Sequence, residues 1–177
     1  VAQLLFWSAD AWAEDLDARY FSFVWHSLLL ATLASLLVCG FALMLGLIKR
    51  RYSNKRTRLI VQLAGLGYAI PGTVLAVGVF VPIAWLDNQL IEIMATFSMA
   101  SSGVLKGSIA VMLLALSARF LVVGFSPIDA ALERITPHHE DAARSLGLNA
   151  GAVLRRLHLP LASGGIMTGL LLVFVDV

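Results

Sequence analysis

The sequence predicts an all-α protein built as a polytopic transmembrane helical bundle. Of its 177 residues, 59% are hydrophobic and only 14% are charged, whereas a soluble domain carries about 25% charged residues. The apolar residues gather in uncharged runs, and about 20 such residues cross a hydrocarbon core of about 30 Å. Because so few charges cannot cover a water-facing surface, the composition indicates a membrane protein.

Four apolar runs are the candidate spans, and they cover about residues 24–48, 59–86, 107–125 and 161–177. Pro71 and Gly72 lie near the middle of the second run. Because proline lacks an amide donor and clashes with the preceding turn, we expect a kink or break there. The chain begins with Val1, and its fourth run stops at the chain end. We therefore expect a piece of a longer protein, with a truncated fourth span.

The charges between these runs predict the orientation. The short loop after the first run is the most basic segment, with Lys49, Arg50, Arg51, Lys55, Arg56 and Arg58. Short loops this basic stay on the cytoplasmic side. Alternation then puts residues 87–106 outside, together with a periplasmic lead-in of residues 1–20, and puts residues 126–160 inside. Residues 21–177 form one transmembrane domain.

Charged or helix-breaking residues inside the runs are candidate functional positions. Arg119 lies about two turns from the cytoplasmic end of its run and can snorkel, which favours a structural role. Asp176 lies about 22 Å up the last run, where it can face a substrate path or pair with a missing segment. Pro71 and Gly72 can open a break that lines a cavity, although a kink for helix packing is the commoner explanation.

The predicted inner loop, residues 126–160, interrupts the apolar chain with a charged segment. Thr136 and Pro137 suit the N-cap and the first position of a helix. Glu140 follows in the first turn, where an acid suits the positive helix end, and it can pair with Arg144 one turn later. A short helix is therefore expected to begin at this point.

A glycine turn and a second helix are predicted next in this loop. Gly147 tolerates the positive φ with which helices commonly end. Asn149 can cap a helix over residues 150–159, and Pro160 stands at the entry to the last span.

The first helix of the loop carries a small apolar patch of Ala142, Ala143 and Leu146. This patch can seat in a groove of a partner protein. Alternatively, the segment is an ordinary amphipathic connector that rests on the membrane. The residue types alone favour neither interpretation.

A spaced pattern in the loop carries a resemblance to a known family. D-A-A-x3-G-x9-L-x-L-P is formed by Asp141, Ala142, Ala143, Gly147, Leu157, Leu159 and Pro160. It resembles the EAA loop of ABC importer inner-membrane permeases, E-A-A-x3-G-x9-I-x-L-P. Aspartate stands in the glutamate position, with Glu140 directly before it, and leucine replaces isoleucine. The resemblance extends to YAIPGTVLAVGV at residues 68–79 and to SLLLATLASLL at residues 27–37.

The resemblance implies a type I ABC importer permease fold in the bacterial inner membrane. It implies a coupling helix that sits in a cleft of a separate cytoplasmic ATPase subunit, with Asp141, Ala142 and Ala143 on the docking face and Gly147 at the turn. The coupling residues that it implies are Glu140, Asp141, Ala142, Ala143, Gly147, Leu157, Leu159 and Pro160. The other implied partners are a periplasmic substrate-binding protein and a second permease half or subunit.

Within this family the nearest resemblance is to permeases for ferric iron, as the second half of a fused protein. LLLVFVDV at residues 170–177 shares in this resemblance. Related permeases for polyamines, sulfate and thiamine have much of the same pattern, so these substrates remain alternatives.

Other functional classes fit the sequence less well. No nucleophile–base pair supports an intramembrane enzyme, and no G-x4-G-K-[ST] loop is found, so we expect no catalytic residue and no bound cofactor. His138 and His139 point about 100° apart on a helix, without a spaced third ligand, so we expect no metal site. The basic residues lie at span ends rather than in a nucleic-acid-binding patch. A purely structural membrane subunit leaves the spacing of the loop unexplained.

Overall fold

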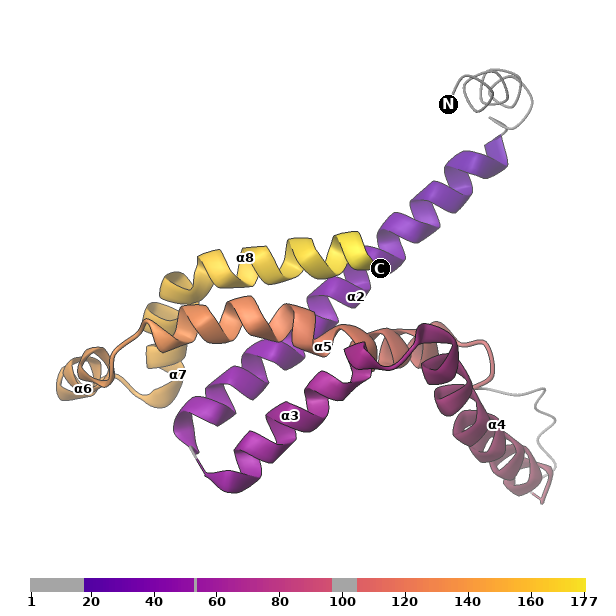
Figure 1. The fold of residues 1–177 in the computed structure, drawn as a ribbon, viewed down its shortest axis with the longest axis horizontal. Helices are drawn as coiled ribbons and strands as arrows, with labels where there is room; N and C mark the ends of the chain where they lie inside the picture. The colour runs from indigo at the N-terminus through magenta and orange to yellow at the C-terminus, as the bar shows by residue number, and fades with distance from the viewer. Residues whose placement is uncertain (1–17, 53, 97–104) are drawn as a thin grey trace.

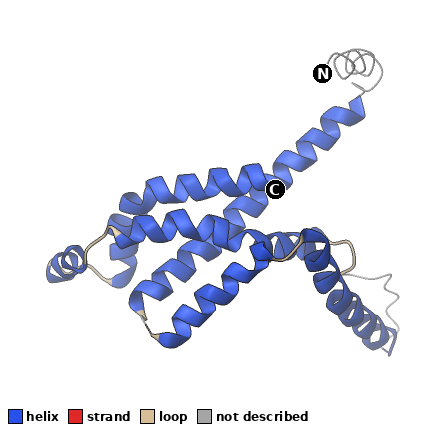
Figure 2. Cartoon of the chain, in the orientation of Figure 1, coloured by secondary structure: helices blue, strands red, loops and turns tan. Residues whose placement is uncertain are grey.

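The computed structural model describes residues 18–52, 54–96 and 105–177. Every regular element within these ranges is a helix (Figure 2). This confirms the all-α class. The predicted lead-in of residues 1–20 falls almost entirely outside the described residues, as does much of the predicted outer loop.

Seven α-helices and one π-helical turn follow one another along the described chain. They are α2 (Ala18–Arg51), α3 (Lys55–Ala69), α4 (Gly72–Thr96), α5 (Ile109–Glu133), α6 (Pro137–Ser145), α7 (Ala150–Val153), the π-helical turn η1 (Leu154–His158) and α8 (Leu159–Asp176).

Three of these helices form the core of the bundle. α5 packs along α2 and along α8, and α2 also contacts α8 (Figure 1). The buried side chains between them form two groups: Cys39, Ala42, Phe125, Ile128, Leu132, Ile135 and Ala162 in one, and Val38, Phe120 and Val173 in the other. α3 lies against α5 as well, whereas α4 turns away from the core (Figure 1).

Small residues allow the helices to approach closely, as is common in membrane bundles. A side chain at Gly165 of α8 would overlap the carbonyl oxygen of Pro127 on α5. A side chain at Gly67 of α3 would overlap the carbonyl oxygen of Ala118, also on α5. Backbone therefore meets backbone at both crossings, and glycine is required for the observed packing.

The second predicted span, residues 59–86, is not a single helix. α3 ends at Ala69, Ile70 is extended with φ −81° and ψ 131°, and α4 begins at Gly72. The break expected at Pro71 is confirmed, and it divides the apolar run between two helices. Proline disfavours the helical conformation of the residue before it, which accounts for Ile70. Of the two helices, α4 is the one long and apolar enough to cross a membrane.

The third helix extends beyond its apolar run. α5 continues through Pro127 to Glu133, because Ile128 and Leu132 are buried against the other core helices. The helix therefore extends past the predicted span end at residue 125, and the connection to α6 begins only after Glu133.

The last helix begins well before the predicted span at residue 161. Helical structure is continuous from Ala150 to Asp176. Near its start lies η1, in which the Leu159 N–H bonds to the Leu154 carbonyl. π-helical turns and prolines often occur where the regular hydrogen-bond ladder is interrupted, and Pro160 follows directly after this turn. Pro160 therefore does not separate the loop from the span.

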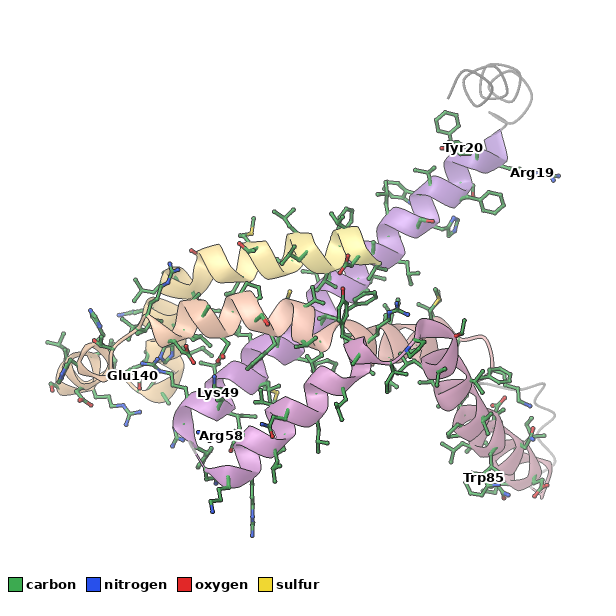
Figure 3. The ribbon with its side chains drawn as sticks, viewed as in Figure 1. Arg19, Tyr20, Lys49, Arg58, Trp85 and Glu140 are labelled. Carbon is green, nitrogen blue, oxygen red and sulfur yellow. The ribbon has the colours of Figure 1, made fainter. Side chains whose placement is uncertain are left out.

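Four helical segments of the described chain are long and apolar enough to cross a membrane: Arg19–Arg51, Gly72–Met94, Ile109–Glu133 and Ala150–Asp176. The polytopic helical bundle is therefore confirmed. Figure 3 places Lys49, Arg58 and Glu140 at one end of the bundle, and Tyr20 and Trp85 far from it. The two segments predicted to be cytoplasmic thus share one end, called the basic end below.

Candidate coupling site

α6 lies at the basic end of the bundle and ends in the turn predicted at Gly147 (Figure 1). Gly147 has φ +81°. Its N–H donates to the Arg144 carbonyl at 2.9 Å, and the Leu148 N–H donates to the Ala143 carbonyl at 3.2 Å. These two bonds form a Schellman motif, which commonly places glycine at a positive φ. The prediction for Gly147 is confirmed.

The first residues of α6 also follow the prediction in position. Thr136 is the N-cap residue and Pro137 begins the helix. The Thr136 side chain makes no capping bond; its Oγ1 lies 2.7 Å from Nδ1 of His139. In the part of the chain that the structure describes, no three His, Cys, Asp or Glu residues gather in an arrangement suited to a metal ion.

The two faces of α6 have different surroundings. Asp141 and Ala142 are exposed, and Leu146 at the end of the helix is 83% exposed. Ala143 is only 9% exposed and faces the rest of the chain. The face open to a partner therefore includes Asp141, Ala142 and Leu146, beside other exposed residues such as His138 and Ser145, whereas Ala143 belongs to the inner face.

Glu140 also lies on the inner face of α6, where it contacts two side chains that local spacing does not predict. Its Oε1 accepts a hydrogen bond from Nε of Arg50 at 2.5 Å and lies 2.9 Å from Nε2 of His158. The expected pair with Arg144 is not formed, because Arg50 and the buried His158 approach Glu140 from α2 and η1. Two partners from other elements thus replace one partner on the same helix.

Arg50 extends this contact to the end of α5. Its Nη1 donates to the Leu132 carbonyl at 2.6 Å, and its Nη2 donates to the Ile135 carbonyl at 2.5 Å. These carbonyls lie at and just after the C-terminal end of α5, where the helix dipole makes a cation favourable. One guanidinium therefore contacts α5 and α6 together.

The pKa of Glu140 predicts a pH dependence of stability. Burial alone raises the pKa of this carboxyl, but the hydrogen bonds from Arg50 and His158 outweigh burial and leave it below its ordinary value of 4.5. A lowered carboxyl pKa stabilises the fold fully above the ordinary value, and this stabilisation is lost as pH falls through the lowered pKa. We expect wild type to be more stable than Glu140→Gln at pH 7, with the difference in melting temperature disappearing in acid below pH 4.5. A difference that persisted there would contradict this assignment.

The turn after α6 leads directly into the last helix. Asn149 caps α7 as predicted, with its Oδ1 accepting from the Ala152 N–H at 2.8 Å. Leu157 packs against the buried core, Leu159 is half-buried, and Pro160 is exposed. These residues form one helix with α8, so the loop has a continuous connection to the span.

A cavity of about 530 Å³ lies between α6, α7 and the end of α2. Its lining residues are Leu47, Arg50, Arg51, Glu140, Arg144, Ala150, Val153, Leu154 and His158. The cavity lies beside the inner face of α6, and Arg50, Glu140 and His158 are among the residues that line it.

A second ion-pair group holds α2 to α5 at the basic end. Nζ of Lys49 lies 2.5 Å from Oδ2 of Asp129 and 3.0 Å from Oε1 of Glu133. Sequence reasoning missed this group because it ended the third span at residue 125. The available signal was the spacing of Asp129 and Glu133, which places two acids on one helical face.

The candidate path residues lie away from the coupling site. The guanidinium of Arg119 lies against Gly72 at the break between α3 and α4, and its Nε is buried without a hydrogen-bond partner. Gly72 lies farther from the basic end than Gly67, which meets α5 at Ala118. The Arg119 side chain therefore extends away from the basic end. The expectation that Arg119 snorkels toward that end is wrong. Asp176 is exposed near the end of α8.

These features define a class: a multi-pass helical membrane protein with a short helix, a glycine turn and a continuous final helix at its basic end. Residues 39–177 match the family model described as the binding-protein-dependent transport system inner membrane component. The chain belongs to this family of ABC importer permeases, which are transport subunits that work with ATPase and substrate-binding proteins. Comparison with curated proteins and with solved structures gives no further match.

Proposed function

We propose that this chain is the transmembrane permease subunit of an ATP-driven importer in the bacterial inner membrane, and that α6 couples it to a separate cytoplasmic ATPase subunit. The observation that carries this proposal is the exposed face of Asp141, Ala142 and Leu146 on a short helix closed by the Gly147 turn. A small, smooth helical face suits docking in a groove.

The continuity of the last helix supports the same proposal. Leu157, Leu159 and Pro160 belong to the helical stretch that runs from Asn149 into α8. Leu157 also packs on the core. A displacement passed from α6 through the short Gly147 turn would therefore reach the final span along one continuous helix.

The proposed substrate is ferric iron, delivered by a periplasmic binding protein. The resemblance of residues 170–177 to ferric-iron permeases supports this substrate. The proposed path includes Pro71, Gly72 and Asp176, with a second permease half or subunit opposite them. Non-helical backbone at membrane depth is tolerated where it is covered by protein or lines a cavity, and the extended Ile70 would meet this condition beside a second permease half or subunit.

The experiment that tests the proposal uses the complete transporter, reconstituted in liposomes with its ATPase subunit. ATP hydrolysis is compared with binding proteins carrying ferric iron, polyamine, sulfate or thiamine, and with empty binding protein. We expect stimulation by the ferric-loaded protein alone. Stimulation by another cargo would support the permease assignment but exclude ferric iron as the substrate. No stimulation by any cargo, together with no stable ATPase complex, would overturn the proposed function and favour a structural membrane subunit.

A further inference from the structure

The Glu140 cluster, defined as Arg50, Glu140 and His158, joins four segments at one point. Arg50 ends α2, Glu140 lies on α6, and His158 ends η1 directly before α8. The fourth segment is the C-terminal end of α5, whose carbonyls accept from Arg50. Every core helix is therefore connected to α6 through this cluster.

The rest of α6 is more loosely attached to the core. Its main packing partner is the short helix α7. The cavity of about 530 Å³ lies beside its inner face, and Ala143 offers only a methyl group to that side. A displacement of α6 therefore reaches the core helices through the flanking chain and through the Glu140 side chain.

The chemistry of the cluster suits the transmission of movement. The guanidinium is a rigid planar fork, so its contacts with Glu140 and with the two carbonyls move together. The side chains of Arg50 and Glu140 are each 20% exposed, and that of His158 is 10% exposed. Removing one partner of such a shielded pair leaves the other charge unpaired, unlike the loss of a pair at an open surface.

We infer that the Glu140 cluster is the joint that passes a displacement of α6 to α2, α5 and α8. Arg50, Glu140 and His158 are then positioning residues for coupling, although two of them lie outside the D-A-A-x3-G-x9-L-x-L-P pattern. This inference rests on the proposed function of α6 as the coupling helix. It adds which side chains connect that helix to the core.

Two conservative variants test the joint in the complete transporter. Glu140→Gln retains the shape of the side chain and removes its charge. Arg50→Lys retains the charge and removes the fork that contacts α5 and α6 together. We expect transport and cargo-stimulated ATP hydrolysis to fall by roughly 5-fold or more in each variant, the lower limit of a typical allosteric coupling.

Glu133→Gln is the matched control. It removes an ion pair of 3.0 Å between α2 and α5 at the same end of the bundle without touching α6, and Lys49 keeps its pair with Asp129. We expect wild-type transport from this variant. An equal loss in Glu133→Gln would mean that any charge removed at the basic end impairs transport, and the joint would be rejected.

A second readout separates transmission from simple placement of α6. Ala142→Cys is combined with each variant, and its cross-linking to the ATPase subunit is measured. The joint requires normal cross-linking with reduced transport. Loss of the cross-link in Glu140→Gln would mean that Glu140 only holds α6 in place, and normal transport in both variants would also reject the joint. Absence of the cross-link with otherwise wild-type protein would instead overturn the proposed function.

Discussion

Gly147→Asp is expected to uncouple ATP hydrolysis from transport. Gly147 has φ +81°, a conformation that costs a residue with a side chain about 1 kcal/mol. A carboxylate desolvated in a partner groove costs more than the roughly 1–3 kcal/mol of an unpaired neutral polar group. Together these terms correspond to a loss of roughly tenfold or more in cargo-stimulated ATP hydrolysis and in transport. Both rates are measured in liposomes that contain the complete transporter.

Gly107→Asp is the control for this experiment. Gly107 has φ +75°, and, as at Gly147, nothing lies within 4 Å of an added Cβ. The backbone strain and the added charge are therefore similar, but Gly107 precedes α5 and lies away from the coupling site. We expect this variant to transport normally. If Gly147→Asp transported as well as Gly107→Asp, the Gly147 turn would have no role in coupling.

Gly165→Ala is expected to destabilise the permease itself. The added methyl would overlap the carbonyl oxygen of Pro127 and lie 2.5 Å from the Cβ of Ala131. Because the first of these is a backbone atom, α5 and α8 must separate. Overpacking of this kind costs about 1–3 kcal/mol of the free energy of unfolding. The measurement is the melting temperature of the permease in mild detergent, which we expect to fall.

Gly164→Ala tests whether this effect is specific to the crossing. Gly164 is the preceding residue of α8, and nothing lies within 4 Å of an added Cβ. Alanine is the better helix former, so this variant should be as stable as wild type or more stable. Equal melting temperatures for the two variants would contradict the observed packing of α8 on α5.

Features set by local backbone chemistry were predictable from the sequence. Pro71 broke its helix where proline excludes the preceding residue from the helical conformation. Gly147 took the positive φ of a helix end, and Asn149 capped the next helix through its side chain. Each of these outcomes depends on a few neighbouring residues, which is why the pattern alone sufficed.

Features set by contacts between distant segments were not predictable in the same way. Glu140 pairs with Arg50 and His158 rather than with Arg144, because α2 and η1 meet α6 at that point. The extension of α5 to Glu133 likewise depends on the burial of Ile128 and Leu132 against other helices. Hydrophobic run length marks the membrane-embedded part of a helix, not the end of the helix.

Arg119 illustrates the same limit within a span. A charged residue near a membrane surface is expected to extend toward water. Its direction here follows from the break at Pro71, where Gly72 has no side chain and so leaves the guanidinium room beside the backbone. The room for the Arg119 guanidinium therefore lies between α5 and the break that separates α3 from α4. Only folding brings these two segments together.

The central claim is that α6 docks on the ATPase subunit, and cysteine cross-linking tests it most directly. Cys39 is the only cysteine of the chain, and it is buried, so its background is low. Ala142→Cys and Leu146→Cys place thiols on the exposed face of α6, and Tyr20→Cys places one at the far end of α2. We expect cross-links to the ATPase subunit from positions 142 and 146 and none from position 20. An intact ATPase complex without a cross-link from either α6 position would contradict the claim.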